Sequence, residues 1–400
     1  MADQTLARYV NELSILTMLR TEGSASRAQI ARRLSLTPGT ITRVVSELAR
    51  RGLVQEIPGP IQAAVREPGR PAISLALNPT GAYFLGVEMG VGVMRYALLD
   101  LAASVVASTE VVVSRSITPK KAVRAIAEQV ARYQDARRFA GKIQAAGVTV
   151  PGLVTSEGYI VHLPILGWKN VNLLAMLRDA TQLPFIVENN ANAAAFGSVY
   201  TQPNLPSLCT IFLKLGTGCG GAAIINGRLL RGAAGTATEF GHMRITEHGH
   251  RCSCGQVGCL ESWVNLEAMA RIFRGTADLT RSELAALPSR IAAAAAVGDG
   301  GAAAAVASLT HYLSLGIVTL SNIFNPTTFM LGGVMRPLLE CCLEAVKVRV
   351  AEGIVPGMKM PEIRLSHLGV MECAVGAATI AHHHAFDIST VELQEHELRA

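Results

Sequence analysis

The sequence has no apolar run that approaches the roughly 18 residues of a membrane-spanning helix, although half of its residues are apolar. Residues 1–11 are polar and charged and lack the apolar core of a signal peptide. Five of the eight cysteines lie outside one short motif and show no disulfide framework: Cys209, Cys219, Cys341, Cys342 and Cys373. We therefore expect a protein of the reducing cytoplasm and no membrane partner.

Positive charge is concentrated at the N-terminal end. Residues 1–80 contain ten Arg and six acidic residues, so they carry +4 of the net charge of +6 of the 400-residue chain. This asymmetry fits nucleic-acid binding, but a solvated basic surface has the same composition. A chain of this length also exceeds one core, so about two or three domains are expected.

Residues 13–53 have the pattern of three short helices. Ser26 and Gln29 form a capping box at the start of the second helix, and Thr37 followed by Pro38 suits the start of the third. Apolar residues then recur at helical spacing: Ile41, Val44, Val45 and Leu48. Two alternating segments, 53–57 and 73–77, predict a hairpin, which completes a winged helix-turn-helix.

The face of the third helix opposite this stripe carries small and hydroxyl side chains and Arg43, which suits the major groove of DNA. In the wing, Arg70 can enter a minor groove, although a plain Pro/Gly loop at 66–71 is an equal alternative. For the whole segment the alternative is a helical protein-interaction domain. The residues predicted to bind DNA are Ser26, Arg27, Thr37, Gly39, Thr40, Thr42, Arg43 and Arg70.

A histidine and three cysteines cluster within residues 242–259: His242, Cys252, Cys254 and Cys259. Such a soft-ligand set closes a tetrahedral zinc site, and Gly255 and Gly258 allow the tight turns that this requires. Four protein ligands leave no open position for a hydrolytic water, so we expect one structural Zn(II) per chain. A disulfide or a group of buried free thiols is the alternative.

After a turn-rich linker at 78–81, apolar strands alternate with Ala-rich helices, which predicts an α/β fold with a mixed sheet. The segments EFGH at 239–242 and CSCGQVGCLE at 252–261 resemble the zinc motif of the ROK family, which groups sugar kinases with sugar-responsive transcriptional repressors. The resemblance covers almost all of residues 81–386. Further segments match the family order: 150–153, 164–168, 187–195, 215–221 and 331–334.

The resemblance implies a two-lobed, actin-like ATPase (ribonuclease-H-like) domain behind the winged helix-turn-helix. We expect the DNA-binding domain at 1–80, a first lobe at 81–196 and a second lobe with the zinc motif at 197–375. A C-terminal helix at 376–400 is expected to pack back onto the first lobe. The resemblance also implies a sugar site made of Asn189, Asn190, Glu239, His242 and Glu261.

The kinase pattern fails in two places. The catalytic Asp of ROK kinases is matched by Asn190, and an amide cannot accept a proton at neutral pH. The first phosphate motif, DxGGT, is matched by EMGVG at 88–92, where Val91 and Gly92 replace Gly and Thr. On the sugar side, Ile165 stands where the family usually has Asn, so the ligand can differ from glucose.

These patterns and the ROK resemblance together predict a cytoplasmic, sugar-responsive transcriptional regulator of the repressor type, which binds operator DNA as a homodimer or homotetramer. The alternative is an ATP-dependent sugar kinase with an added DNA-binding domain, and a zinc sensor is disfavoured because the ligand set looks closed. We expect sugar to close the cleft between the lobes and change the separation of the DNA-binding heads. The histidines at 382–384 predict a helical face or a weak surface site, because consecutive helical residues do not converge on one ion. The Ala tracts at 292–296 and 302–305 predict ordinary helices.

Overall fold

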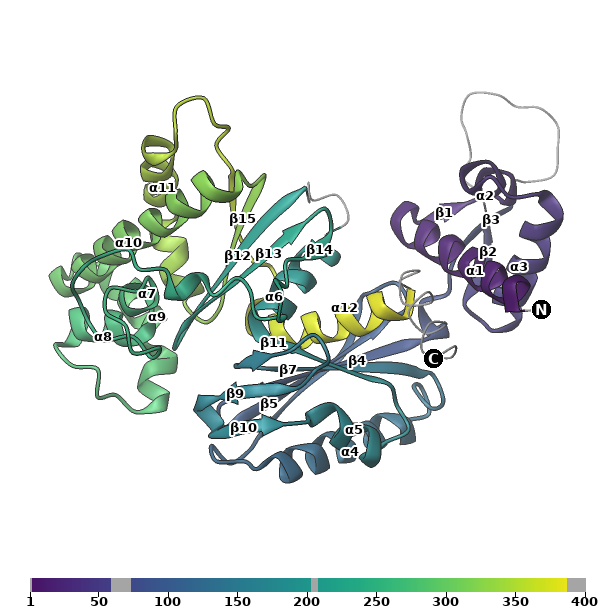
Figure 1. Cartoon of the computed structure of the whole chain (residues 1–400), viewed down its shortest axis with the longest axis horizontal. Helices are drawn as coiled ribbons and strands as arrows, with labels where there is room; N and C mark the ends of the chain where they lie inside the picture. The colour runs from purple at the N-terminus through teal and green to yellow at the C-terminus, as the bar shows by residue number, and fades with distance from the viewer. Residues whose placement is uncertain (1, 59–72, 203–207, 387–400) are drawn as a thin grey trace.

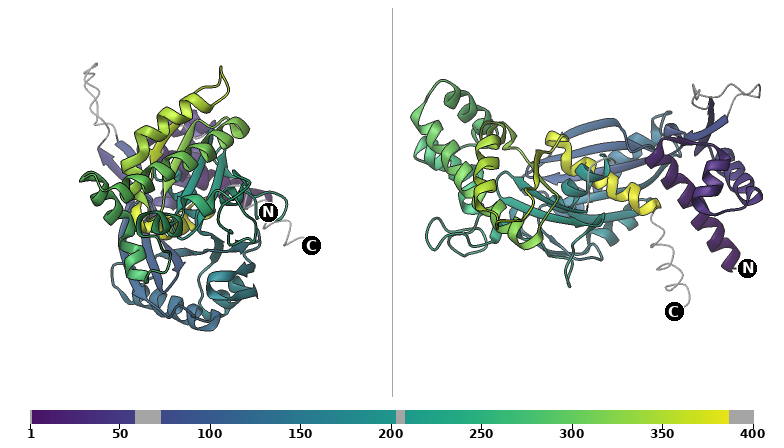
Figure 2. Two further views of the ribbon diagram at one scale, coloured as in Figure 1. Left: turned by 90° about the vertical axis from the view of Figure 1, so that its left-hand side faces the viewer. Right: turned by 90° about the horizontal axis from the view of Figure 1, so that it is seen from above.

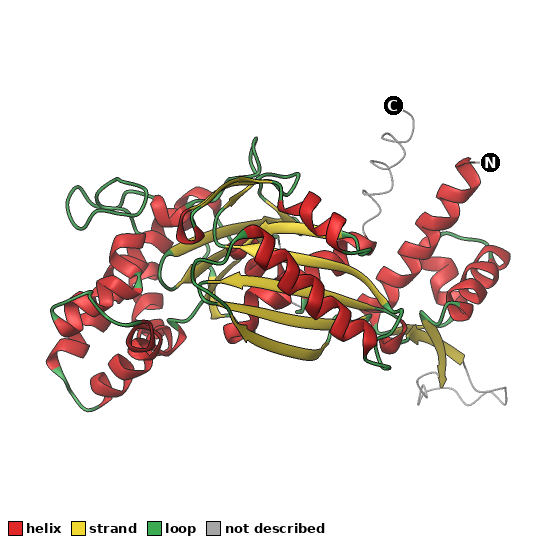
Figure 3. Cartoon of the chain, turned by 90° about the horizontal axis from the view of Figure 1, so that it is seen from below, coloured by secondary structure: helices red, strands yellow, loops and turns green. Residues whose placement is uncertain are grey.

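The structure is a computed structural model that describes residues 2–58, 73–202 and 208–386. A small head lies at one end of an elongated molecule, and two larger α/β lobes follow it (Figures 1 and 2). Seen from below, the strands of the lobes occupy the middle of the molecule, with helices gathered at both ends (Figure 3).

The head contains three helices and a three-stranded sheet of order β1-β3-β2. Its elements are α1 Ala2–Glu22, β1 Ser24–Ala25, α2 Arg27–Leu34, α3 Pro38–Arg50, β2 Val54–Pro58 and β3 Ile73–Leu77. Both predicted caps are present: the Ser26 side chain accepts from the Gln29 amide, and Thr37 accepts from the Thr40 amide. The predicted stripe of α3 is buried in the core of the head. The wing tip, including Arg70, lies outside the described residues.

Lobe 1 is built on a five-stranded mixed sheet of order β11-β7-β4-β5-β6. These strands are β4 Tyr83–Gly90, β5 Val93–Asp100, β6 Val105–Val112, β7 Ile143–Val150 and β11 Phe185–Asn189. The helices α4 Pro119–Asp135 and α5 Leu173–Ala180 supply apolar residues to the same core as this sheet. A small second sheet contains β8 Leu153–Val154, β9 Ile160–Leu163 and β10 Trp168–Val171.

Lobe 2 repeats the sheet topology of lobe 1. Its order is β14-β13-β12-β15-β16, with three antiparallel strands followed by two parallel ones, as in lobe 1. The strands are β12 Cys209–Leu215, β13 Cys219–Ile225, β14 Arg228–Leu229, β15 Thr328–Gly332 and β16 Glu362–Leu365. The helices are α7 Glu261–Val264, α8 Leu266–Arg274, α9 Arg281–Ala296, α10 Gly300–Phe324 and α11 Arg336–Gly353. This repeat confirms the predicted duplicated fold, and both Ala tracts lie in or beside ordinary helices.

One helix departs from the expectation about apolar runs. By length and composition alone, α10 Gly300–Phe324 is apolar enough to cross a membrane. Small and hydroxyl side chains lie between its apolar residues, so the sequence contains no continuous apolar stretch of that length here. In the structure α10 packs against α8, α9 and α11, and its inner face supplies Leu309, Leu313 and Ile317 to the core of lobe 2.

Two helices form a layer between the lobe sheets: α6 Asn190–Tyr200 and α12 Glu372–Phe386. The helix α12 lies on β4, β5 and β7 of lobe 1, whereas α6 contacts β12 and β13 of lobe 2, and the two helices pack on each other. Their contact is close because Gly197 faces Gly376: a Cβ on Gly197 would lie 2.7 Å from the Gly376 Cα. The domain limits stay a prediction, and residues 387–400 lie outside the description.

The three consecutive histidines lie on the helix α12, as predicted, but the first of them is a core residue and cannot belong to a surface site. His382 is fully buried and lies between the rings of Phe84 and Phe386, with ring centroids 4.6 and 4.7 Å away. The apolar side chains of the head continue into this region, since Phe84, Leu101 and Ala381 belong to the same buried cluster as the core of the head. The head is therefore attached to lobe 1 and α12 by a shared core.

The close packing of α6 and α12 gives a direct test. We expect Gly376→Ala to lower the free energy of unfolding by about 1–3 kcal/mol or more, because its Cβ would overlap the Ala193 carbonyl oxygen. Gly300→Ala is the matched control, since no atom lies within 4 Å of a Cβ there and Ala favours a helix. Urea unfolding measures both, and equal midpoints for the two variants would contradict this packing.

Candidate functional site

A polar cleft lies between the two lobes. It is lined from lobe 1 and α6 by Gly152, Leu153, Val154, Asn189 and Asn192, and from lobe 2 and its loops by Gly221, Gly235, Thr236, Ala237 and Glu239. Of the five residues predicted to bind sugar, Asn189 and Glu239 line this cleft. Ile165, at the position that departs from the family pattern, is 47% exposed and does not line it.

The asparagines at the start of α6 differ in how their polar atoms are used. The Asn189 side chain accepts from the Ala191 amide at 2.7 Å and donates to the Gly152 carbonyl at 2.9 Å. Asn190 is buried, and its Oδ1 has no hydrogen-bond partner among the described residues. A buried acceptor without a donor is costly, so this oxygen has unused capacity to accept a hydrogen bond, although Asn190 does not line the cleft.

A buried carboxylate organises these asparagines, and the sequence did not single it out. Glu188 accepts from the Asn189 amide at 2.8 Å and from Asn192 Nδ2 at 2.9 Å. Its second oxygen forms an ion pair with Arg231 of lobe 2 at 2.6 Å. Glu188, Asn192 and Arg231 are the site residues that the prediction missed. Arg231 is more than forty positions from Glu188, so no local pattern joins them.

His242 and the three cysteines come together as predicted. Their ligand atoms all lie within 4.8 Å of one another, with Cys252 Sγ 3.3 Å from His242 Nδ1 and Cys254 Sγ 3.7 Å from Cys259 Sγ. Gly255 and Gly258 have positive φ angles of 90° and 83°. At Gly258 a side chain would also overlap the Thr246 carbonyl. The turn that gathers the thiols therefore depends on glycine.

All eight cysteines are free in this structure. Glu239 lies beside the cluster, with its Oε2 3.7 Å from His242 Nε2. Burial raises the pKa of Glu239, and Glu261 adds to that effect, while the nearby histidine opposes it. His242 thus links the cysteine cluster to the residue that lines the cleft.

Glu261 does not line the cleft. One carboxylate oxygen accepts from the Cys219 amide at 2.9 Å, and the other accepts from Ser253 Oγ at 2.7 Å and contacts Cys252 Sγ at 3.3 Å. It therefore ties the glycine-rich turn before β13 to the cysteine motif. In this structure its two oxygens are already used by the protein.

Ion pairs within the protein lie beside two of the loops that resemble phosphate or nucleotide loops, at residues 88–92 and 331–334. Glu88 is buried and pairs with Arg95 at 3.2 Å, and Arg95 also pairs with Glu110 at 2.8 Å. The buried Glu372 accepts from the Gly333 amide at 3.2 Å and lies 3.9 Å from Lys214 Nζ. Burial raises the pKa of Glu372, and Lys214 opposes this. The acidic groups here are matched by cations of the same chain.

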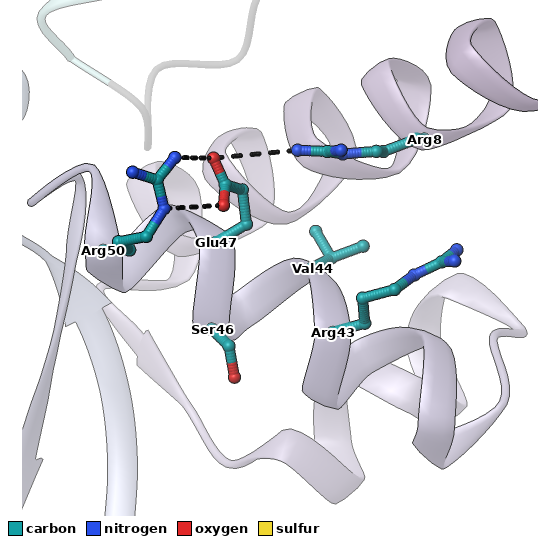
Figure 4. A pocket seen from close by; sticks show the side chains of 6 residues that line it. All are labelled: Arg8, Arg43, Val44, Ser46, Glu47 and Arg50. Atoms are coloured by element: carbon teal, nitrogen blue, oxygen red, sulfur yellow. Dashed lines mark hydrogen bonds and ion pairs between the residues drawn. The ribbon is translucent and has the colours of Figure 1, made fainter.

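The recognition face of α3 is open, and it carries a cation without an ion pair in the described part of the chain. Gly39, Thr42, Arg43 and Ser46 are exposed. By contrast, Arg50 pairs with Glu47 at 2.6 Å, and Arg8 approaches the same carboxylate at 3.7 Å. Figure 4 shows Arg43 extending away from this cluster across the pocket that they line together.

Several of the other residues predicted to bind DNA make contacts inside the head. Arg27 pairs with Glu56 of β2 at 2.8 Å. The hydroxyl of Thr42 donates to the Pro38 carbonyl, and Thr37 and Thr40 bond each other at 3.0 Å. Arg43 is therefore the side chain of this set most free to reach another molecule.

Comparison with known proteins matches this architecture. A model of the ROK family matches residues 84–384, and one of the MarR family matches residues 9–60. The xylose repressor of Bacillus spizizenii is 28% identical over 97% of this chain and 98% of its own length. A glucokinase of Halalkalibacterium halodurans is 29% identical over 72% of this chain and 91% of its own length.

Among solved structures, a ROK family transcriptional regulator described as a homolog of the E. coli MLC protein superposes with a TM-score of 0.79 and 25% identity. It covers 96% of this chain and 99% of its own. Repressor relatives match the head as well as the lobes, whereas the glucokinase matches a smaller share of the chain. The family model covers three quarters of the sequence, and the chain therefore belongs to the ROK family.

Proposed function

We propose that this protein is a sugar-responsive transcriptional regulator, of the repressor type, whose kinase-like lobes bind a sugar and control binding of the head to operator DNA. The observation that carries the proposal is that one molecule combines two sites. The open recognition helix carries Arg43, which has no ion pair among the described residues, and the shared core attaches this head to the lobes that form the polar cleft. The repressors among its relatives support it. The sugar contacts we propose are Asn189, Asn190 and Glu239, with His242 and Glu261 completing the site when the lobes close.

The DNA-binding role depends on Arg43. A good bidentate contact to guanine contributes about 1–3 kcal/mol, so Arg43→Ala is expected to weaken binding to a duplex selected by the wild-type protein by roughly 5–150-fold and to relax its base preference. Arg124→Ala is the matched control, because Arg124 is an exposed arginine on α4 of lobe 1. Fluorescence anisotropy at fixed salt measures both. Specific binding by a fragment that lacks residues 1–80 would contradict the assignment.

We propose that the cysteine cluster holds one structural Zn(II) through His242, Cys252, Cys254 and Cys259. Zinc–sulfur bonds of about 2.3 Å in a tetrahedron place two sulfurs about 3.8 Å apart, and Cys254 and Cys259 are 3.7 Å apart. A disulfide would need about 2.05 Å. Four protein ligands fill the coordination shell, which favours a structural ion over a catalytic or sensing one.

Removal of one zinc ligand is expected to lower metal content and stability together. Cys254→Ser should reduce zinc well below one per chain and lower the melting temperature, since structural zinc binding supplies folding free energy. Cys341→Ser is the control, because Cys341 is also exposed but lies on α11 outside the cluster. Elemental analysis with thermal unfolding measures both. A Cys254→Ser protein with full zinc and unchanged stability would contradict this assignment.

We propose that the kinase-like domain does not phosphorylate sugar. The position of the catalytic Asp is Asn190, which cannot act as a general base. The first phosphate loop has Val91 and Gly92 in place of Gly and Thr, and Glu88 beside it is already paired with Arg95. The kinase alternative needs a proton acceptor and an open phosphate loop.

The catalytic test separates these two classes of protein. General-base catalysis contributes about 10²–10⁴-fold, and loss of phosphate positioning adds to that. The wild-type protein is therefore expected to bind sugar without ATP-dependent phosphorylation, and Asn190→Asp should restore little. A coupled assay with D-xylose and D-glucose measures this, with the Halalkalibacterium glucokinase as positive control. Turnover of about 1–100 s⁻¹ by the wild-type protein would establish the kinase alternative instead.

We further propose a cytoplasmic homodimer or homotetramer. One recognition helix reads only a few base pairs, and two heads related by two-fold symmetry read paired half-sites. A sugar can alter the spacing of the heads only if it binds one arrangement of the lobes better than another. The Glu188–Arg231 pair, which joins α6 and β11 to lobe 2 across the cleft, is the contact most directly exposed to such a rearrangement.

A further inference from the structure

One helix spans the distance between the polar cleft and the head. The helix α6 starts at Asn190 and is capped by Asn189, and Asn189 and Asn192 line the cleft. It ends at Tyr200, and the guanidinium carbon of Arg20, in the head, lies 4.1 Å from the centroid of the Tyr200 ring. Eleven residues at about 1.5 Å each give a rod of about 16 Å.

This rod is confined along its length. Residues 190–198 are all buried. On one side α6 contacts α12, where Gly197 and Gly376 bring the two backbones together, and on the other it contacts β12 and β13. A close-packed interior transmits strain, and a shift of about 1–2 Å by a whole helix is a recognised form of switching. A displacement at Asn189 is therefore carried to Tyr200.

At the far end the Tyr200 side chain is held in one orientation. The ring stacks on Phe196 with centroids 5.4 Å apart, and its hydroxyl is 2.8 Å from His382 Nδ1. His382 Nε2 is 2.9 Å from the Leu101 carbonyl oxygen, which can only accept, so Nε2 carries a proton. Burial lowers the pKa of His382 to about 3, so the ring is neutral and Nδ1 accepts from the tyrosine hydroxyl.

On the head side, Arg20 lies in the last turn of α1 and has no acidic partner in the described residues. The same helix packs against α3. Glu12 of α1 also pairs with Arg51, which caps the end of α3, at 2.6 Å. A shift of α1 therefore shifts the recognition helix. The guanidinium over the Tyr200 ring is a cation–π contact, which depends on the position of the ring face.

We propose that α6 transmits the state of the cleft to the head, and that the Arg20–Tyr200 contact is the point where it does so. This inference rests on the proposed function, because it assigns the route by which a sugar alters operator binding. Arg20 and Tyr200 are coupling residues: neither lines the cleft, and neither lies on the exposed face of α3. Their loss should uncouple the two sites and leave each site able to bind.

The experiment measures operator affinity with and without sugar. The DNA is a duplex selected by the wild-type protein, and the sugar is the one that gives the largest thermal shift in a panel of pentoses, hexoses and their phosphates. Coupling between two sites typically amounts to about 5–150-fold, which is the change expected for wild type. Arg20→Gln and Tyr200→Leu should reduce it to less than about 2-fold, with the sugar Kd and the sugar-free operator affinity nearly unchanged.

Two further variants separate coupling from general stability. Tyr200→Phe keeps the ring under Arg20 but loses the His382 bond, so an intermediate ratio is expected. Arg274→Gln is the matched control, because it removes another cation–aromatic contact, with Phe273 at 5.6 Å on α8 of lobe 2. This control should keep the wild-type ratio. A residue that only stabilises the fold would change the melting temperature and leave the ratio intact.

The outcomes are distinct. If wild type responds to sugar and Arg20→Gln, folded and able to bind both ligands, keeps the full ratio, the route is wrong and the proposed function stands. If the ratio collapses in Arg20→Gln and Tyr200→Leu but not in Arg274→Gln, the route is supported. If wild-type operator binding responds to no sugar of the panel, the proposed function and this inference both fail.

Discussion

The structure depends on the close packing of α12 against lobe 1, α6, lobe 2 and the core of the head. Its first residue, Glu372, accepts from the Gly333 amide of lobe 2, and Gly376 meets α6 backbone to backbone. On either side of Gly376, Ala374 and Ala378 contact Gly86 of lobe 1, and Ala381 joins the core of the head. Small side chains make these approaches possible, because larger ones would separate the layers. One helix thus fixes the relation between three parts of the molecule.

Much of this architecture could be predicted because its signals are local. The caps at Ser26 and Thr37, the buried stripe of α3 and the CxC motif each lie within a few residues, and the structure brings each set together. Strand alternation and the family resemblance gave the mixed sheets, and the repeat of the sheet topology agrees with them. Local periodicity and spacing are the features that sequence expresses most directly.

The contacts that sequence could not supply join distant residues. Nothing near Glu188 indicates Arg231 as its partner, and nothing near Glu261 indicates that the Cys219 amide and Ser253 use its oxygens. The burial of His382 was also missed, since three consecutive histidines look like a surface pattern, whereas Phe84 of lobe 1 and Phe386 of α12 cover one of them. Of the site residues that were assigned by resemblance, Asn189 and Glu239 line the cleft and Glu261 does not, and the hydrogen bonds of these residues follow from tertiary packing.

The place of α12 in the chain has a consequence for synthesis. The inner faces of β4 and β7, at Gly86 and Gly147, are covered by Ala374, Ala377 and Ala378. Between the last strand of lobe 1, β11, and α12 lies the whole of lobe 2. At about 5–20 residues per second, a ribosome needs roughly 10–40 seconds to make that stretch. During this interval one apolar face of the lobe 1 sheet is not yet covered by α12. We therefore expect this face to be exposed to chaperones while the rest of the chain is synthesised.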